Sequence, residues 1–113
     1  MGVLAIGQVV LVPFPFSDLS RTKMRPAVIL AEAGREDWIL CQVTSNPYGD
    51  SRAITLMEKD FKSGALRVTS YARPGKIFTA NETLIAETVG VLKKKAANDL
   101  IEAVITMFRE NMV

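Results

Sequence analysis

Short apolar runs separated by turn-forming residues make up most of the chain, and this pattern predicts β-strands. The runs are rich in β-branched residues and are bounded by Gly, Pro, Asn or Asp, as strand ends usually are. The run at 66–71 also alternates between two sides, which is typical of a strand with one buried face. Seven segments are expected to be strands: residues 8–12, 26–31, 37–44, 53–56, 66–71, 76–79 and 88–92.

The end of the chain has helical rather than strand periodicity. Asn98 or Asp99 can cap a helix that runs from Leu100 to about Met112. The apolar positions of this segment fall on one stripe at helical spacing, which indicates packing against a core or an interface. They are Leu100, Ile101, Val104, Ile105 and Phe108. We therefore expect one C-terminal helix that carries no chemistry of its own.

The order of these elements predicts the fold class. A single helical turn is expected at residues 57–62, closed by Gly64. Seven short strands and one terminal helix predict a mainly β fold, a small and strongly bent antiparallel barrel. With 113 residues, of which 49% are hydrophobic and 23% charged, the chain suits a single globular domain, residues 1–113.

Charge and cysteine content restrict the expected binding partners and cellular environment. The net charge of +2 permits nucleic-acid binding without arguing for it, so a phosphate site must come from local clustering. Cys41 is the single cysteine and lies in an apolar run, which suits a core residue in a reducing cytoplasm. No apolar run reaches the roughly 20 residues of a membrane span, so we expect no membrane partner.

The residue types that are missing exclude several kinds of chemistry. The chain has no histidine, which excludes histidine general bases, histidine triads and most zinc sites. One cysteine cannot build a thiolate cage, and the acidic residues are dispersed, so neither a metal nor a carboxylate pair is expected. The seven glycines are scattered, so they form no phosphate-binding loop. Arginines and hydroxyls remain as the candidate chemical groups.

Arg25 and Thr44 are the first candidates for such a site. Pro26 restricts Arg25 to extended geometry at the start of a strand, and a guanidinium held there suits phosphate or carboxylate. The alternative is a solvated arginine at a strand entrance. Thr44 and Ser45 end the next strand, either as functional groups or as turn formers. An antiparallel hairpin of the two strands would bring Arg25 and Thr44 to the same end of the sheet.

Other basic and aromatic residues could extend this site. Arg21 and Lys23 add positive charge to the loop of residues 17–24, which suits a flap over a substrate. Arg73 forms a second Arg-Pro pair and either lines the same groove or marks another strand exit. Tyr48 and two phenylalanines, Phe14 and Phe16, are possible platforms for base stacking, although core packing is the expected role of both phenylalanines.

The chain resembles the MazF/PemK-like toxins. Residues 7–20 and 23–30 resemble the opening motif of that family, residues 42–45 its second motif and residues 70–79 its third. The motifs follow one another in the same order over nearly the whole chain. Gln8 is a departure, because relatives often carry an acidic residue after the glycine, and this change concerns local hydrogen bonding.

The resemblance implies an SH3-like small barrel of the CcdB/PemK type with a C-terminal helix, forming a homodimer. It implies a toxin of a type II toxin–antitoxin pair, bound by a cognate antitoxin and reaching operator DNA only through that antitoxin. The implied activity is a metal-independent endoribonuclease that needs no cofactor. It cuts single-stranded RNA, including mRNA, leaves a 2′,3′-cyclic phosphate and a 5′-hydroxyl, and so inhibits translation.

The same resemblance assigns roles to individual residues. The family's catalytic arginine falls on Arg25 and its catalytic threonine on Thr44. A protonated Arg25 would stabilise charge on the phosphorus, and Thr44 would donate to the phosphate or position the 2′-hydroxyl. The general base is open between Asp18 and water. Substrate contacts are expected from Arg21, Lys23, Ser45, Ser70 and Arg73.

Two other classes of function stay open at this point. A related barrel toxin can act by binding a protein target such as gyrase, and an inactive relative can be kept for binding alone. A plain RNA-binding barrel is the third class. The Arg25 and Thr44 pair favours the nuclease, whereas the modest net charge is mild evidence against general nucleic-acid binding.

Overall fold

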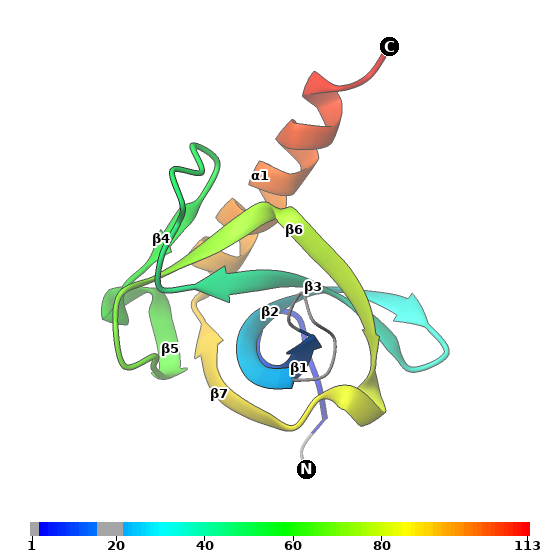
Figure 1. Cartoon of the computed structure of the whole chain (residues 1–113), viewed down its shortest axis with the longest axis vertical. Coiled ribbons are helices and arrows are strands. Elements are labelled where there is room, and N and C mark those ends of the chain that lie inside the picture. Colours follow the sequence, from blue (N-terminus) through cyan, green and yellow to red (C-terminus); the bar gives the residue numbers. More distant parts are fainter. Residues whose placement is uncertain (1–2, 16–21) are drawn as a thin grey trace.

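A curled antiparallel sheet of seven strands, with one helix at the C-terminus, forms the protein (Figure 1). The computed structural model describes residues 3–15 and 22–113. The strand order is β4-β6-β3-β2-β1-β7-β5. The elements are β1 (Gln8–Pro15), β2 (Thr22–Gly34), β3 (Asp37–Thr44), β4 (Ile54–Leu56), η1 (Glu58–Asp60), β5 (Phe61–Gly64), β6 (Ser70–Asn81), η2 (Glu82–Leu84), β7 (Glu87–Leu92) and α1 (Lys94–Glu110). The expected barrel fold with a terminal helix is confirmed.

Two apolar cores cover the two faces of the central strands. One core includes Val28 and Cys41 and packs against Leu100 of α1. The other includes Ile29 and Leu40 and lies on the opposite face of the sheet. Because both faces are buried, β2 and β3 carry continuous apolar runs rather than an alternating pattern. None of the helices in the described ranges is long and apolar enough to cross a membrane.

The pairing between β2 and β3 ends next to Pro26, at one end of the sheet. The antiparallel ladder between these strands ends at the pair Ala27↔Gln42. β2 continues for five more residues while it pairs with β1, through Leu11↔Pro26 and Val12↔Arg25. Proline has no N–H to donate, so it suits a position where one side of the strand is unpaired. The end of β3 turns instead to β6, through the pair Thr44↔Tyr71.

β6 is one long strand, where the sequence predicted two short ones. It pairs with β3 at Val43↔Ala72 and again at Cys41↔Ile77, so residues 73–76 form a bulge. Pro74 within this bulge is fully buried, which explains how a proline occurs inside a central strand. Figure 1 shows β6 bending beside α1. The prediction of separate strands at 66–71 and 76–79 was therefore wrong, as was the strand exit at Arg73.

Residues 57–64 form a 3₁₀ turn followed by a short strand. The expected helical turn is limited to η1, and β5 then pairs with β7 up to Gly64↔Gly90. Gly64 has φ +67°, and a Cβ atom here would clash with the carbonyl oxygen of Val89. The glycine thus permits a close strand pairing rather than ending a helix. Residues 65–69 belong to no strand, although their sequence alternates.

Helix α1 begins at Lys94, earlier than the predicted start at Leu100. Lys93 occupies the N-cap position, so Asn98 and Asp99 lie inside the helix and neither is its cap. The first turns are held by burial of Ala96 and Ala97 against the sheet. Alanine favours helix strongly but adds little to an apolar pattern, which is why the apolar stripe alone placed the start too late.

Candidate active site

Arg25 and Thr44 lie at the end of the sheet where β2 and β3 separate. The last pairs of their ladder are Val28↔Cys41 and Ala27↔Gln42. Continuing that register by two positions places Arg25 opposite Thr44, and residues opposite each other in an antiparallel pair share a face of the sheet. The hairpin and the common end expected from the sequence are therefore present. Arg25 is half-buried, within β2 rather than at its entrance.

The Thr44 hydroxyl is fixed by the turn that follows it. Thr44 is 7% exposed, and its Oγ1 accepts a hydrogen bond from the backbone N–H of Asn46 at 3.2 Å. A hydroxyl has one proton to donate besides its acceptor lone pairs. Among the described residues, no acceptor takes that proton within hydrogen-bonding distance. The turn-forming role and a donor role are thus compatible in the same side chain.

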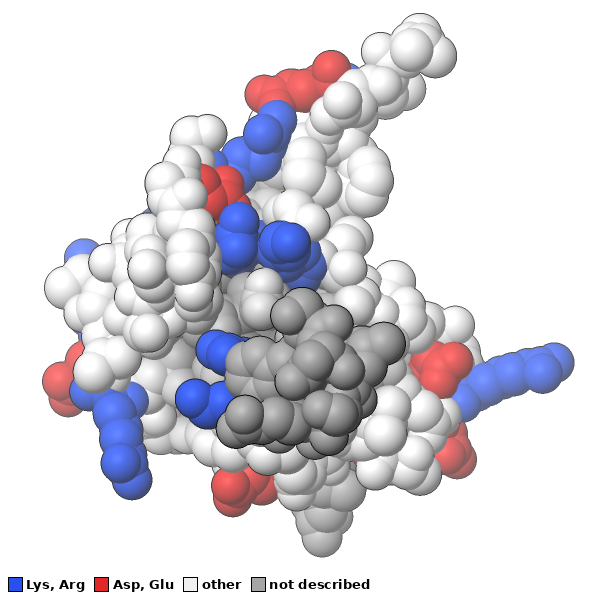
Figure 2. Space-filling model, in the orientation of Figure 1, with Lys and Arg blue, Asp and Glu red and all other residues white. Residues whose placement is uncertain are grey.

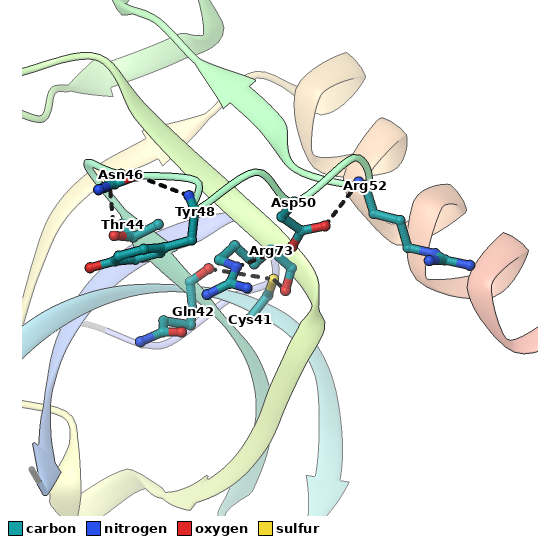
Figure 3. Close-up of polar contacts among 8 residues, drawn as sticks. All are labelled: Cys41, Gln42, Thr44, Asn46, Tyr48, Asp50, Arg52 and Arg73. Carbon is teal, nitrogen blue, oxygen red and sulfur yellow. Dashed lines mark hydrogen bonds and ion pairs between the residues drawn. The ribbon is translucent and has the colours of Figure 1, made fainter. Parts of the chain in front are cut away.

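The loop from β3 to β4 carries a second polar cluster, formed by Tyr48, Asp50 and Arg73 (Figure 3). Arg73 lies in the β6 bulge, and its Nε donates to Asp50 Oδ2 at 3.0 Å. The Arg73 guanidinium carbon lies 5.5 Å from the centre of the Tyr48 ring, within cation–π range. This cluster joins the loop to β6 beside the end of β3.

Asp50 remains a carboxylate over the whole neutral range. The backbone N–H of Arg52 and the side chain of Arg73 both hydrogen-bond to it and lower its pKa below the usual value. A lowered pKa means that the ion pair is intact above the normal titration range of aspartate. Its contribution is lost only as the pH falls through the lowered pKa.

Cys41 is a core residue and not a nucleophile. It is fully buried, and its Sγ lies 3.0 Å from the backbone oxygen of Arg73, to which it donates. Burial raises the pKa of the thiol to about 12, so the reactive thiolate is absent at neutral pH. The thiol therefore holds the β6 bulge against β3, which agrees with the structural role expected from the sequence.

The remaining predicted site residues are placed differently from one another. Lys23 is exposed on β2 opposite Phe14, and Ser45 is exposed directly after β3. Ser70 is 4% exposed, and its Oγ donates to the Val68 carbonyl at 3.0 Å, away from the Arg25 face. Arg21 lies outside the described residues.

Several expectations concern residues 16–21, which also lie outside the described part of the chain. Asp18 and Phe16 are among them. Residues 22–24 of the expected loop 17–24 belong to β2, which begins at Thr22. The ring of Phe14 packs edge-to-face on Phe78, with 4.8 Å between the ring centres, which confirms the core role of Phe14.

Asp50 and Tyr71 are neighbours of the site that the sequence reasoning missed. No local pattern pointed to Asp50, whose partner Arg73 is 23 residues away. Tyr71 pairs directly with Thr44, so it shares the face of the sheet that carries Arg25. Neither relation has a local periodicity, and only the pairing of β3 with β6 could have shown them.

Basic side chains gather on one part of the molecular surface. Figure 2 shows several Lys and Arg side chains between the body of the barrel and helix α1. Among the described residues, no group of three or more Cys, Asp or Glu side chains could hold a metal ion. The chemical groups available here are therefore guanidinium, hydroxyl, phenol and a paired carboxylate.

Comparison with solved structures gives the same fold at low sequence identity. The MazE–MazF complex (form III) from Deinococcus radiodurans superposes with a TM-score of 0.75 at 18% identity, covering 95% of this chain and 97% of that one. Mycobacterium tuberculosis toxin MazF-mt6 gives a TM-score of 0.69 at 16% identity, covering 90% and 96%. An endoribonuclease in complex with its cognate antitoxin from a mycobacterial species gives 0.69 at 18%, covering 92% and 93%.

Comparison with protein-family sequence models identifies a family for this chain as well as a fold. No curated protein sequence matches the chain significantly. The family model of the PemK-like, MazF-like toxins of type II toxin–antitoxin systems matches residues 5–108. This range includes every strand and nearly all of α1. The chain belongs to the PemK-like, MazF-like family of type II toxin–antitoxin toxins.

Proposed function

We propose that the protein is an endoribonuclease that cuts single-stranded RNA. The observation that carries the proposal is the position of Arg25 and Thr44 on one face, where the β2–β3 ladder separates. Family membership and the description of a structural neighbour as an endoribonuclease support it. A guanidinium and a hydroxyl donor suit phosphate chemistry in which the RNA supplies its own nucleophile.

The proposed reaction is attack by the RNA's 2′-hydroxyl on the adjacent phosphorus. The 2′-oxygen bonds to phosphorus as its proton passes to the general base, for which Asp18 and water are the candidates. The bond from phosphorus to the 5′-oxygen breaks as that oxygen takes a proton from water. The products are a 2′,3′-cyclic phosphate and a 5′-hydroxyl. Arg25 stays protonated and stabilises the extra charge on the phosphoryl oxygens. Thr44 donates a hydrogen bond to the same phosphate or orients the 2′-hydroxyl.

Cleavage should persist in excess EDTA. The chain has no histidine, and the proposed charge stabiliser is a guanidinium, so chelation should leave the rate unchanged. The measurement is the cleavage of a single-stranded RNA in EDTA and in Mg²⁺, with end-group analysis of the products. RNA binding without cleavage would instead favour a binding protein, and loss of activity in EDTA would overturn the metal-independent mechanism.

We also propose that the toxin is a homodimer that binds a cognate antitoxin and reaches operator DNA only through it. The antitoxin complexes among the structural neighbours support the antitoxin partner. Helix α1 keeps Phe108 at 56% exposure, an apolar side chain that association could cover. Sedimentation should give about twice the 12.4 kDa chain mass, and more with antitoxin. A monomer at micromolar concentration would remove the dimer from the proposal.

A further inference from the structure

Tyr48 is an exposed aromatic side chain on a constrained backbone. It is 68% exposed, yet its φ of +54° lies in the left-handed region. A residue with a Cβ atom adopts that region at a cost in energy, and such strain is concentrated at functional sites. The backbone N–H of Tyr48 donates to Asn46 Oδ1 at 2.9 Å, which holds the residue in this conformation. Tyr48 thus combines a solvent-exposed aromatic ring with a constrained backbone, which is unusual for a residue with no function.

Two successive hydrogen bonds connect Tyr48 to the candidate catalytic residue Thr44. Asn46 donates through its backbone N–H to Thr44 Oγ1, and Asn46 Oδ1 accepts from the backbone of Tyr48. Both bonds lie at the end of β3 and in the loop that follows it (Figure 3). The backbone that carries Tyr48 is therefore linked to the Thr44 hydroxyl through Asn46.

Arg73 supports one side of the Tyr48 ring. Its side chain is 19% exposed and its Nε pairs with Asp50, which is 18% exposed, so the guanidinium is held in place beneath solvent-facing groups. The two Nη groups of Arg73 make no hydrogen bond with any described residue. Asp50 is itself held by the backbone N–H of Arg52 at 2.9 Å. The ring thus has a cation on one side, while most of its surface faces solvent.

We propose that Tyr48 is a stacking platform for one base of the RNA, beside the phosphate handled by Arg25 and Thr44. This inference rests on the proposed nuclease function and adds a nucleotide subsite to it. Stacking on an aromatic ring tolerates any base and suits single-stranded RNA, whose bases are free to leave their neighbours. Arg73 supports the ring, and the Nη groups of Arg73 are available to bind an adjacent phosphate of the RNA.

The test uses a single-stranded RNA whose cleavage site has first been mapped with the wild-type protein. The probe for binding carries 2′-fluoro groups in place of the 2′-hydroxyls, so it cannot be cut. A series of such probes replaces each base in turn by an abasic site. Affinity is measured by fluorescence anisotropy for wild type, Tyr48→Ala, Tyr48→Phe and the control Leu84→Ala, which removes another side chain that is 52% exposed.

One abasic position should weaken binding of the wild-type protein about 5- to 150-fold, the range for loss of one stacked base. Tyr48→Ala should lower the affinity for the intact probe by a similar factor. The affinity of this variant should fall little further when the probe carries that abasic site, because both changes remove the same contact. Tyr48→Phe keeps the ring and should bind like wild type, as should Leu84→Ala. Should Tyr48→Ala fold poorly, Tyr48→Leu takes its place in the cycle.

Additive losses at every position would overturn the stacking role, as would a Tyr48→Phe variant as weak as Tyr48→Ala. If either result is found while the wild-type protein still cuts RNA, the proposed subsite is wrong and the proposed nuclease function stands. A wild-type protein that neither cuts nor binds single-stranded RNA would remove the proposed function together with the subsite.

Discussion

Replacing Arg25 by alanine should lower the rate of RNA cleavage by roughly two to three orders of magnitude, the cost of losing one charge donor in a transition state. The guanidinium is the group that can offset the charge developing on the phosphoryl oxygens. Arg25 lies on the same face as Thr44 at the point where β2 leaves β3. Single-turnover cleavage rates of the wild type and the Arg25→Ala variant measure the effect directly.

The control for this experiment is Arg67→Ala, which removes an exposed arginine from the turn before β6 and should leave the rate near that of wild type. Thr44→Ala should also impair cleavage, whereas Thr44→Ser keeps the hydroxyl and should retain more activity. Circular dichroism and thermal melting must show that each variant is folded. Full cleavage by a folded Arg25→Ala protein would show that the catalytic assignment is wrong.

Leu100→Ala should lower the free energy of unfolding by about 2–5 kcal/mol, the range for truncating a fully buried leucine. Leu100 is 0% exposed and joins α1 to the core formed by Val28, Cys41 and Val43. The loss combines the transfer free energy of the removed atoms with the cavity that they leave. Urea denaturation followed by circular dichroism measures it, at one protein concentration because association would otherwise shift the midpoint.

Leu84→Ala is the matched control, since it makes the same substitution at a site that is 52% exposed. It should change the stability by less than about 0.5 kcal/mol. Equal losses in both variants would mean that the helix does not pack on the sheet through Leu100. A large loss confined to Leu100→Ala would confirm that contact.

The local sequence pattern was sufficient to predict elements that depend on neighbouring residues. β3 occupies the predicted residues Asp37–Thr44, because a continuous apolar run between turn residues has few alternatives to a buried strand. The β2–β3 hairpin was predicted as well, since neighbouring strands joined by a short turn usually pair. Together they place Arg25 and Thr44 at one end of the sheet, so the centre of the candidate site could be predicted before its geometry was known.

Pairings between distant parts of the chain were decided only in the folded molecule. Residues 65–69 alternate like a strand but have no partner strand, whereas the Arg73–Pro74 pair lies within β6, because buried Pro74 fits a bulge opposite β3. That bulge brings Arg73 to Asp50 and Tyr48.

The sequence by itself therefore determined the mainly β class, the strand β3, the single terminal helix and the common end of Arg25 and Thr44, since these depend on neighbouring residues. The length of β6, the start of α1 and the Tyr48 cluster were decided by tertiary structure. The physical reason is that a bulge, an alanine-rich helix start and an ion pair are stabilised by packing and pairing across the barrel, which no local pattern records.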